Sequence, residues 1–224
     1  MSDTNKLTLD TYERYAKQYV DKCPIKMSSE FIDWFDDCFL DINTSAMILE
    51  IGAGSARIAL YLESKGFSVE RTDASKSFVD LMISNGDPAR QLNVLTDEIK
   101  DEYDVIFAEA VFLHFTTKEL DLVLKKIFES LRLGGSLFFT LKKGEGNETE
   151  SKKMNGPRYF QYWNEDGITD LLSKNKYSHI KIDNVKDFRK GNRDWLMVRA
   201  KKQQTQRASS QMYRKMLYES VGFW

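Results

Sequence analysis

The sequence predicts an α/β fold in which a mostly parallel sheet is covered by helices. From residue 46 onward, short apolar runs alternate with amphipathic stretches of helical length, an order typical of βαβ units. A glycine-rich turn, Gly52-Ala53-Gly54, joins the first apolar run to the first helical stretch. Near the carboxyl end, two strand patterns are joined by a short turn around Gly191. The last strand should therefore lie antiparallel beside the previous one.

The amino-terminal segment predicts two helices within residues 8–40. On the first helix, apolar side chains recur at helical spacing on one face: Leu9, Tyr12, Ala16 and Tyr19. Ser28 or Ser29 is expected to cap the second helix. The apolar side of this second helix carries Phe31, Phe35 and Cys38.

The alternating region predicts the strands 46–51, 67–72, 89–94, 103–108 and 136–141. Helices are expected at 56–65, at 76–84, and from a capping box at Thr116 and Glu119 to the pair Gly134-Gly135. A polar stretch, 142–164, precedes a short helix at 165–174 and the strands 177–188 and 194–201. Residues 203–224 are expected to form a linker and an amphipathic helix.

Composition limits the classes of function. The 224-residue chain has 33 Lys and Arg against 34 Asp and Glu, and its net charge of -1 argues against a strong field for nucleic acid or an anionic membrane. No apolar run approaches the roughly 20 residues of a membrane span. Cys23 and Cys38 are too few for a disulfide scaffold and lack metal spacing. We therefore expect no metal site and a cytoplasmic protein.

The glycine-rich turn has the context of a nucleoside-binding site. It follows a strand, opens a helix, and is followed 21 residues after Gly52 by Asp73, about the spacing at which a carboxylate reaches ribose hydroxyls. Arg57 stands where a dinucleotide-binding turn has its third glycine, and no phosphate-binding Gly-Lys-Ser/Thr occurs. Glu50 would repel phosphate but suits an amino group. These features indicate adenosine with an amino-acid tail, as in S-adenosylmethionine; the alternative is a structural turn with a capping aspartate.

The run from Ile48 to Arg57 resembles motif I of class I S-adenosylmethionine-dependent methyltransferases, an acid followed by Gly-x-Gly-x-Gly. Ala56 replaces the third glycine and is expected to tighten the pocket. The resemblance implies a Rossmann-like three-layer sandwich, with a seven-stranded, mostly parallel sheet and an antiparallel last strand. It implies one methyltransferase domain over residues 1–202, with helices in 8–40 as a cover. Further segments resemble a bacterial subgroup of small-molecule and tellurite-resistance-like methyltransferases: 103–114, 141–146, 158–160 and 194–196.

The resemblance also implies which residues contact the cofactor. Glu50 would organise the amino group, the backbone of Gly52, Ala53 and Gly54 would approach the ligand, and Asp73 would hold the ribose. The adenine would be bordered by Ala74, Ser75, Asn93 and Val94. Ala108 and Glu109 would line the sulfonium end, Arg57 would lie beside the turn, and Tyr19, with Tyr12, would cover the cofactor. The acid common in the family after the third strand is missing here until Asp97.

Three residues are candidates for catalysis. His114 lies at the end of a strand and could act as a general base, or as a structural imidazole. Lys142 and Arg158 flank the long polar stretch, which is either a lid or a charged connector. Arg158 could pair with a carboxylate or phosphate of the substrate.

The sequence therefore predicts transfer of a methyl group from S-adenosylmethionine to a small molecule by in-line displacement. Two alternatives stay open: a methyltransferase acting on RNA or protein, and a non-catalytic module that keeps the cofactor pocket. No membrane partner is expected, and nucleic acid is not favoured. The apolar stripe of the last helix could serve self-association or a further domain; it carries Met212, Leu217 and Val221.

Overall fold

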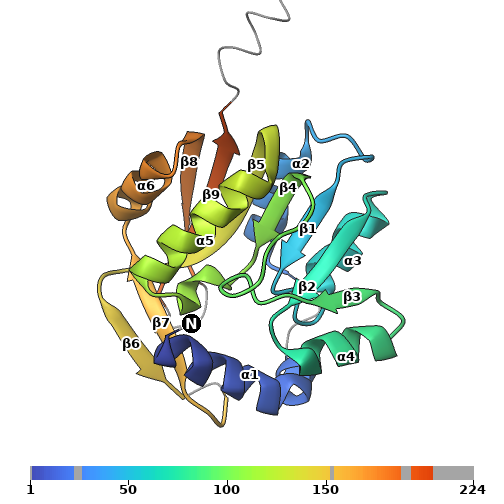
Figure 1. Ribbon diagram of the computed structural model, residues 1–224, viewed down its shortest axis with the longest axis vertical. Helices are drawn as coiled ribbons and strands as arrows, with labels where there is room; N and C mark the ends of the chain where they lie inside the picture. Colours follow the sequence, from blue (N-terminus) through green and yellow to red (C-terminus); the bar gives the residue numbers. More distant parts are fainter. Residues whose placement is uncertain (1, 23–26, 152–153, 188–192, 204–224) are drawn as a thin grey trace, which may run out of the picture.

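The computed structural model describes residues 2–22, 27–151, 154–187 and 193–203, and it confirms the predicted α/β fold (Figure 1). Five parallel strands lie in the order β3-β2-β1-β4-β5. Their bounds are β1 Ile48–Ile51, β2 Val69–Asp73, β3 Ala89–Gln91, β4 Tyr103–Ala108 and β5 Leu131–Lys143. Because the chain runs outward from β1 to β3 and then returns to β4, the strand order reverses between β1 and β4. Open α/β sheets bind ligands at such a reversal.

The last two strands confirm the predicted antiparallel pairing. β9 (Trp195–Lys202) lies antiparallel to both β5 and β8 (Tyr177–Val185). The expected turn around Gly191 and the expected linker and helix at 203–224 lie outside the described residues, apart from Gln203.

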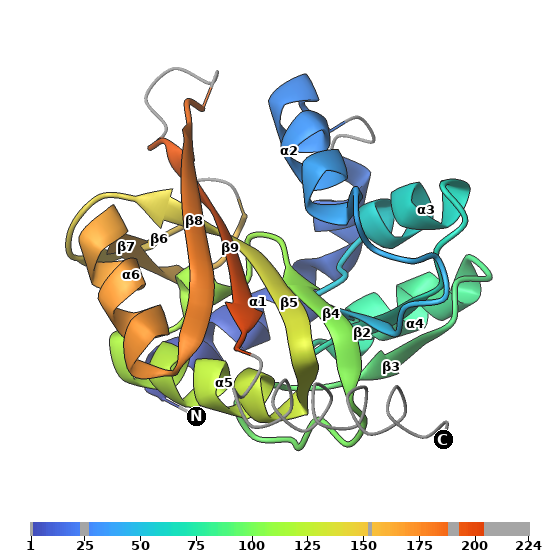
Figure 2. The same cartoon turned by 90° about the horizontal axis from the view of Figure 1, so that it is seen from above.

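Helices cover both faces of the sheet (Figure 2). α2 (Ser29–Phe39) and α3 (Arg57–Ser64) pack on one face, against Ile48, Val105 and Phe107. α5 (Thr117–Ser130) and α6 (Glu165–Lys174) pack on the other, against Leu49 and Ile106. Neighbouring strand residues thus face opposite layers, as the alternation of side chains along a strand requires. Both faces are buried, which explains the continuous apolar runs of the sequence.

Local signals fix several helix boundaries. Ser28 caps α2 by accepting a hydrogen bond from the Phe31 amide, and α5 begins with the predicted capping box of Thr116 and Glu119. α4 spans Lys76–Ser84, as predicted. α5 ends at Ser130, earlier than predicted, because Leu131 already has extended backbone and starts β5.

The polar stretch after β5 is neither a lid loop nor an irregular connector in the described residues. It contains a hairpin of β6 (Asn147–Glu150) and β7 (Arg158–Trp163). β5 is longer than β4, and its projecting end pairs with β7 through Lys142 and Lys143. The hairpin therefore adds two strands to the part of β5 that extends past the carboxyl end of β4. With them the sheet has nine described strands instead of the seven expected.

The first helix, α1 (Asp3–Lys22), starts earlier than predicted and crosses the carboxyl ends of the parallel strands (Figure 1). Its backbone departs from helical geometry at Tyr15. The prediction that α2 covers the site together with α1 is wrong, because the aromatic side of α2 packs on the sheet instead. The cover is therefore formed by α1. No helix among the described residues is long and apolar enough to cross a membrane.

Candidate active site

A pocket lies at the carboxyl ends of β1, β2 and β4, beneath α1, with about 940 Å³ of empty space including its mouth. It therefore lies at the strand-order reversal. Most of the predicted cofactor residues line it: Tyr19, Glu50, Gly52, Ala53, Gly54, Arg57, Asp73, Ala74, Asn93, Val94 and Glu109. His114 lines it as well.

The glycine turn forms the floor of the pocket. The amides of Gly52 and Ala53 both donate to the carbonyl of Thr72, at 2.8 and 2.9 Å, so the turn is fixed to β2. Gly52 has a φ of +74°, and a Cβ at this position would lie 2.4 Å from Cγ2 of Val111. Only glycine combines this backbone with so close a neighbour, so the turn requires glycine in order to pack against Val111.

Ala56 does not itself line the pocket, although its neighbours Ser55 and Arg57 do. It lies just before α3 with a φ of +60° and is buried in a small cluster with Ala53, Val79 and Met82. Its methyl group therefore fills a gap against α4, at the cost of a left-handed backbone that alanine disfavours.

Asp73 is the last residue of β2, and both oxygens of its carboxylate accept hydrogen bonds from backbone amides. One carboxylate oxygen accepts from the Gly54 amide at 3.0 Å and the other from the Ser75 amide at 2.8 Å. Burial raises the pKa of Asp73 to about 6. Each oxygen keeps a free lone pair, so the carboxylate can also accept hydrogen bonds from a pair of hydroxyl groups.

Glu50 is the most unusual polar residue of the site. It is 2% exposed, and its Oε2 has no hydrogen-bond partner among the described residues. Burial raises the pKa of Glu50 well above its usual value, although Arg71 opposes the shift. A buried carboxyl oxygen without a partner is costly, so the geometry fits a ligand that brings a positively charged donor.

Arg57 and Glu109 form an ion pair at the pocket, with Nη2 and Oε2 3.1 Å apart. Arg57 begins α3, and Glu109 follows β4 directly. Both side chains are only partly exposed, 24% and 22%. The ion pair therefore connects the start of α3, which follows the glycine turn, to the end of β4, on the other side of the strand-order reversal.

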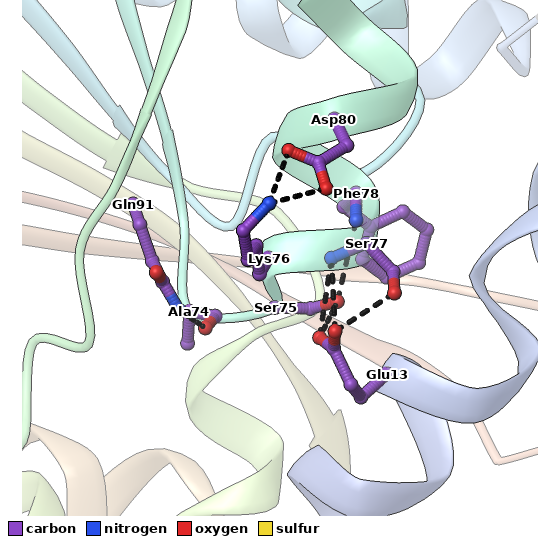
Figure 3. Close-up of polar contacts among 8 residues, drawn as sticks. All are labelled: Glu13, Ala74, Ser75, Lys76, Ser77, Phe78, Asp80 and Gln91. Carbon is purple, nitrogen blue, oxygen red and sulfur yellow. Dashed lines mark hydrogen bonds and ion pairs between the residues drawn. The ribbon is translucent and has the colours of Figure 1, made fainter.

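α1 is held over the pocket by polar contacts. The Glu13 carboxylate accepts hydrogen bonds from the hydroxyls of Ser75 and Ser77 at the start of α4, at 2.7 and 2.8 Å (Figure 3). Thr8 accepts from the Tyr159 amide of β7 at 2.9 Å, and Thr11 donates to the Pro157 carbonyl at 2.7 Å. The helix is therefore fixed to both sides of the site.

Three aromatic rings close the pocket under this cover. The centroids of Tyr12 and Tyr19 are 5.7 Å apart, and Phe78 of α4 lies 6.0 and 5.6 Å from them. Tyr12 and Tyr19 both line the pocket from α1.

His114 is a neutral hydrogen-bonding group, which argues against the predicted general base. Its Nδ1 donates to the Tyr159 carbonyl at 2.6 Å, so its Nε2 accepts from the Tyr12 hydroxyl at 2.9 Å. Burial lowers the pKa of His114 to about 3, and Arg158 adds to the effect. An imidazole with such a pKa is a poor proton acceptor at neutral pH.

Four predicted site residues do not line the pocket. Ser75 caps α4 and contacts Glu13, and Ala108 is buried inside β4. The ammonium group of Lys142 is bound by Asp187 at 2.9 Å, facing β9, because it lies on the part of β5 that projects beyond β4. Arg158 pairs with Glu150 at 2.7 Å and reaches the site through a 3.2 Å hydrogen bond to Tyr12.

Sequence reasoning missed the polar side of α1. Asn5 and Thr8 line the pocket with Leu9, and Phe115 and Val111 close its other side. A signal was present, because Thr4, Thr8 and Thr11 recur at helical spacing. The hydroxyls of Thr8 and Thr11 satisfy backbone groups, and the Thr4 hydroxyl is bonded to that of Ser2, which allows this face to be buried.

The chain is similar to known proteins in sequence and in fold. Residues 49–139 match the model of a methyltransferase domain. The matched segment runs from β1 to β5 and contains the glycine turn, Asp73, Glu109 and His114. No curated protein matches the chain.

Solved structures share the fold of this chain. An S-adenosylmethionine-dependent methyltransferase of Methanosarcina mazei is 16% identical with a TM-score of 0.64, covering 80% of this chain and 99% of its own. Magnesium protoporphyrin IX methyltransferase of Synechocystis, with bound S-adenosylmethionine, is 13% identical with a TM-score of 0.67, covering 90% and 98%. The 1,6-didemethyltoxoflavin-N1-methyltransferase of Burkholderia thailandensis is 18% identical with a TM-score of 0.57, covering 78% and 86%. At these identities the likeness shows the fold.

Proposed function

We propose that the chain transfers a methyl group from S-adenosylmethionine to a small molecule by in-line displacement. One observation carries the proposal: the unpartnered, buried Oε2 of Glu50 lies in the same pocket as the glycine turn and the carboxylate of Asp73. A ligand that supplies an ammonium group and a ribose satisfies both carboxylates. The match to a methyltransferase domain supports this interpretation.

Each residue has a role that follows from its contacts. Glu50 pairs with the ligand ammonium, Gly52 allows close approach, and Asp73 accepts from the ribose hydroxyls. Asn93 and Val94 line the end of the pocket next to Asp73, where the adenine lies. When bound, the cofactor supplies an electrophilic methyl group on a positively charged sulfur. The protein then aligns the acceptor and excludes water.

The cover favours a small acceptor. α1 is fixed across the mouth from both sides, through Glu13 and through Thr8 and Thr11. A folded protein or an RNA helix would have to displace this helix to reach the pocket. The segments 103–114 and 141–146 support placing the chain in the bacterial small-molecule subgroup.

Thermal unfolding with S-adenosylhomocysteine tests the proposal. At about 100 times its dissociation constant, the ligand should stabilise the wild-type fold by roughly 2.7 kcal/mol. Glu50→Gln should lose most of this stabilisation, whereas Glu145→Gln, an exposed residue, should keep it. Wild-type protein that gains no stability at millimolar ligand, or a Glu50→Gln variant that gains as much as wild type, would contradict the proposal.

A further inference from the structure

We propose that the methyl acceptor is a neutral nitrogen atom, in an amine or a nitrogen heterocycle, and that Glu109 stabilises the positive charge that the nitrogen acquires. This inference rests on the proposed function. It is carried by the charges that line the pocket, by the presence of Glu109 in the same pocket as the two cofactor carboxylates, and by the hydrogen bonds that occupy His114.

The described residues that line the pocket carry an excess of acid. Their carboxyl groups belong to Glu50, Asp73 and Glu109, and their one guanidinium belongs to Arg57. Arg57 is already paired with Glu109. The guanidinium that lines the pocket is therefore already engaged, and the described lining offers no unpaired cation to an anionic acceptor such as a carboxylate, a phenolate or a phosphate.

Glu109 lines the same pocket as Glu50 and Asp73. In the cofactor, the sulfur joins the ribose to the amino-acid tail, so it lies between the partners of those two groups, Asp73 and Glu50. Glu109 is close enough to Glu50 and to Tyr12 to influence the pKa of both, and Tyr12 is likewise influenced by Asp73. The Glu109 carboxylate therefore flanks the reacting atoms.

Aromatic rings add to the preference for positive charge. Tyr12, Tyr19 and Phe78 form a wall of three rings, each centroid within 6.0 Å of the next. The faces of aromatic rings attract cations, by about 0.5–2 kcal/mol per contact. A wall of rings opposite a carboxylate is the chemistry that recognises ammonium and sulfonium groups.

His114 is not available as a base for an acceptor that must lose a proton before it attacks. Both ring nitrogens of His114 are committed, one to the Tyr159 carbonyl and one to the Tyr12 hydroxyl. The Tyr12 oxygen also accepts from Arg158, and this cation disfavours a proton on His114. An alcohol or thiol would need to be ionised first. A neutral nitrogen already has the lone pair that attack requires.

The step then balances without further reactants. The nitrogen lone pair forms the new N–C bond while the C–S bond breaks and its electron pair goes to sulfur. The positive charge moves from sulfur to nitrogen, and the nitrogen later releases a proton to water. Glu109 stays beside the positive charge throughout, which lowers the energy of the transition state.

Asn5 supplies a polar anchor for the acceptor. Its side chain is 7% exposed and lines the pocket from α1. A neutral amide can both donate to and accept from an acceptor without adding charge. The anchor and the Glu109 carboxylate together would orient an amine-bearing molecule under the cover.

Sinefungin tests the charge at the transfer point, because it carries an amino group in place of the methylated sulfur. Calorimetry should show that wild type binds sinefungin on the order of tenfold more tightly than S-adenosylhomocysteine, whose sulfur is uncharged, a difference of about 1.4 kcal/mol. Glu109→Gln should reduce this ratio at least fivefold, and Arg57→Gln should increase it. Glu145→Gln should leave it unchanged. A ratio that neither Glu109→Gln nor Arg57→Gln alters would overturn the inference.

A second measurement tests the acceptor class. Protein saturated with S-adenosylhomocysteine is titrated with matched sets of aromatic and aliphatic amines, carboxylic acids and phenols on the same carbon skeletons. Amines should raise the unfolding temperature and the other two classes should not; stabilisation by acids or phenols in preference to amines overturns the inference. If wild type binds neither S-adenosylhomocysteine nor sinefungin, the proposed function fails. If both bind without a charge preference, this inference alone fails.

Discussion

Replacing Gly52 by alanine tests whether the glycine turn is held against Val111 as the structure shows. The backbone at Gly52 has a φ of +74°, which costs an L-residue about 1–2 kcal/mol. The new Cβ would also lie 2.4 Å from Cγ2 of Val111, and overpacking of this kind costs about 1–3 kcal/mol. Gly52→Ala should therefore lower the free energy of unfolding by about 2–5 kcal/mol and weaken binding of S-adenosylhomocysteine.

Gly146 provides a matched control for this prediction. It has the same φ of +74°, but no neighbouring atom of the described residues would lie within 4 Å of a Cβ added there. Urea unfolding should show that Gly146→Ala loses only the backbone part, about 1–2 kcal/mol. Adding Val111→Ala should recover the overpacking part in the Gly52→Ala background. If Gly52→Ala costs no more than Gly146→Ala, or if Val111→Ala gives no recovery, the reasoning about the turn is refuted.

Three further predictions concern single residues. Thr116→Ala removes the capping box of α5 and should destabilise the fold by about 1 kcal/mol in urea unfolding, with cofactor affinity unchanged. Ala56→Gly loses a buried methyl group but relieves the left-handed backbone, so stability should change by less than about 1 kcal/mol and affinity for S-adenosylhomocysteine by less than about twofold. Burial lowers the pKa of His114 from its ordinary value of 6.5 to about 3. The unfolded chain therefore protonates this imidazole more readily than the folded chain, and the free energy of unfolding falls as the pH falls from 6.5 toward 3. In this pH range the free energy of unfolding of wild type should fall by about 1.4 kcal/mol per pH unit more than that of His114→Asn. Equal dependence of the two free energies on pH would contradict a buried, neutral imidazole.

The sheet and most helices could be predicted because their signals are local. β4 at Tyr103–Ala108, α4 at Lys76–Ser84 and α6 at Glu165–Lys174 have the predicted bounds. In each case a periodic apolar pattern is bounded by a capping residue or a turn. The antiparallel last strand followed from the short connection before β9.

The hairpin of β6 and β7 depends on contacts that are distant in sequence. β6 is the polar segment Asn147–Glu150, which carries no apolar alternation, and β7 joins the main sheet through two residue pairs with the end of β5. The aromatic run from Tyr159 to Trp163 has strand propensity. Its partner, however, is set by how far β5 projects beyond β4, which local patterns do not reveal.

The residues of the site likewise divide into those placed by local sequence signals and those placed by contacts that are distant in sequence. Glu50, Gly52 and Asp73 belong to one strand-turn-helix unit and its neighbouring strand, and the predicted motif brings them together. Lys142 was misplaced because its position at a strand end does not say which neighbouring strand it faces. Asn5 was missed because polar residues on an amphipathic helix normally face solvent, and the hairpin that buries this side of α1 was not foreseen.

Methyl transfer itself tests the central claim most directly. The protein is incubated with S-adenosylmethionine that carries a deuterated methyl group, together with a heat-treated cell extract separated into small-molecule, RNA and protein fractions. Mass spectrometry should find the label in the small-molecule fraction, on nitrogen, and should find little label with Glu50→Gln. Label in the RNA or protein fraction, or no label above that of the variant, would contradict the account.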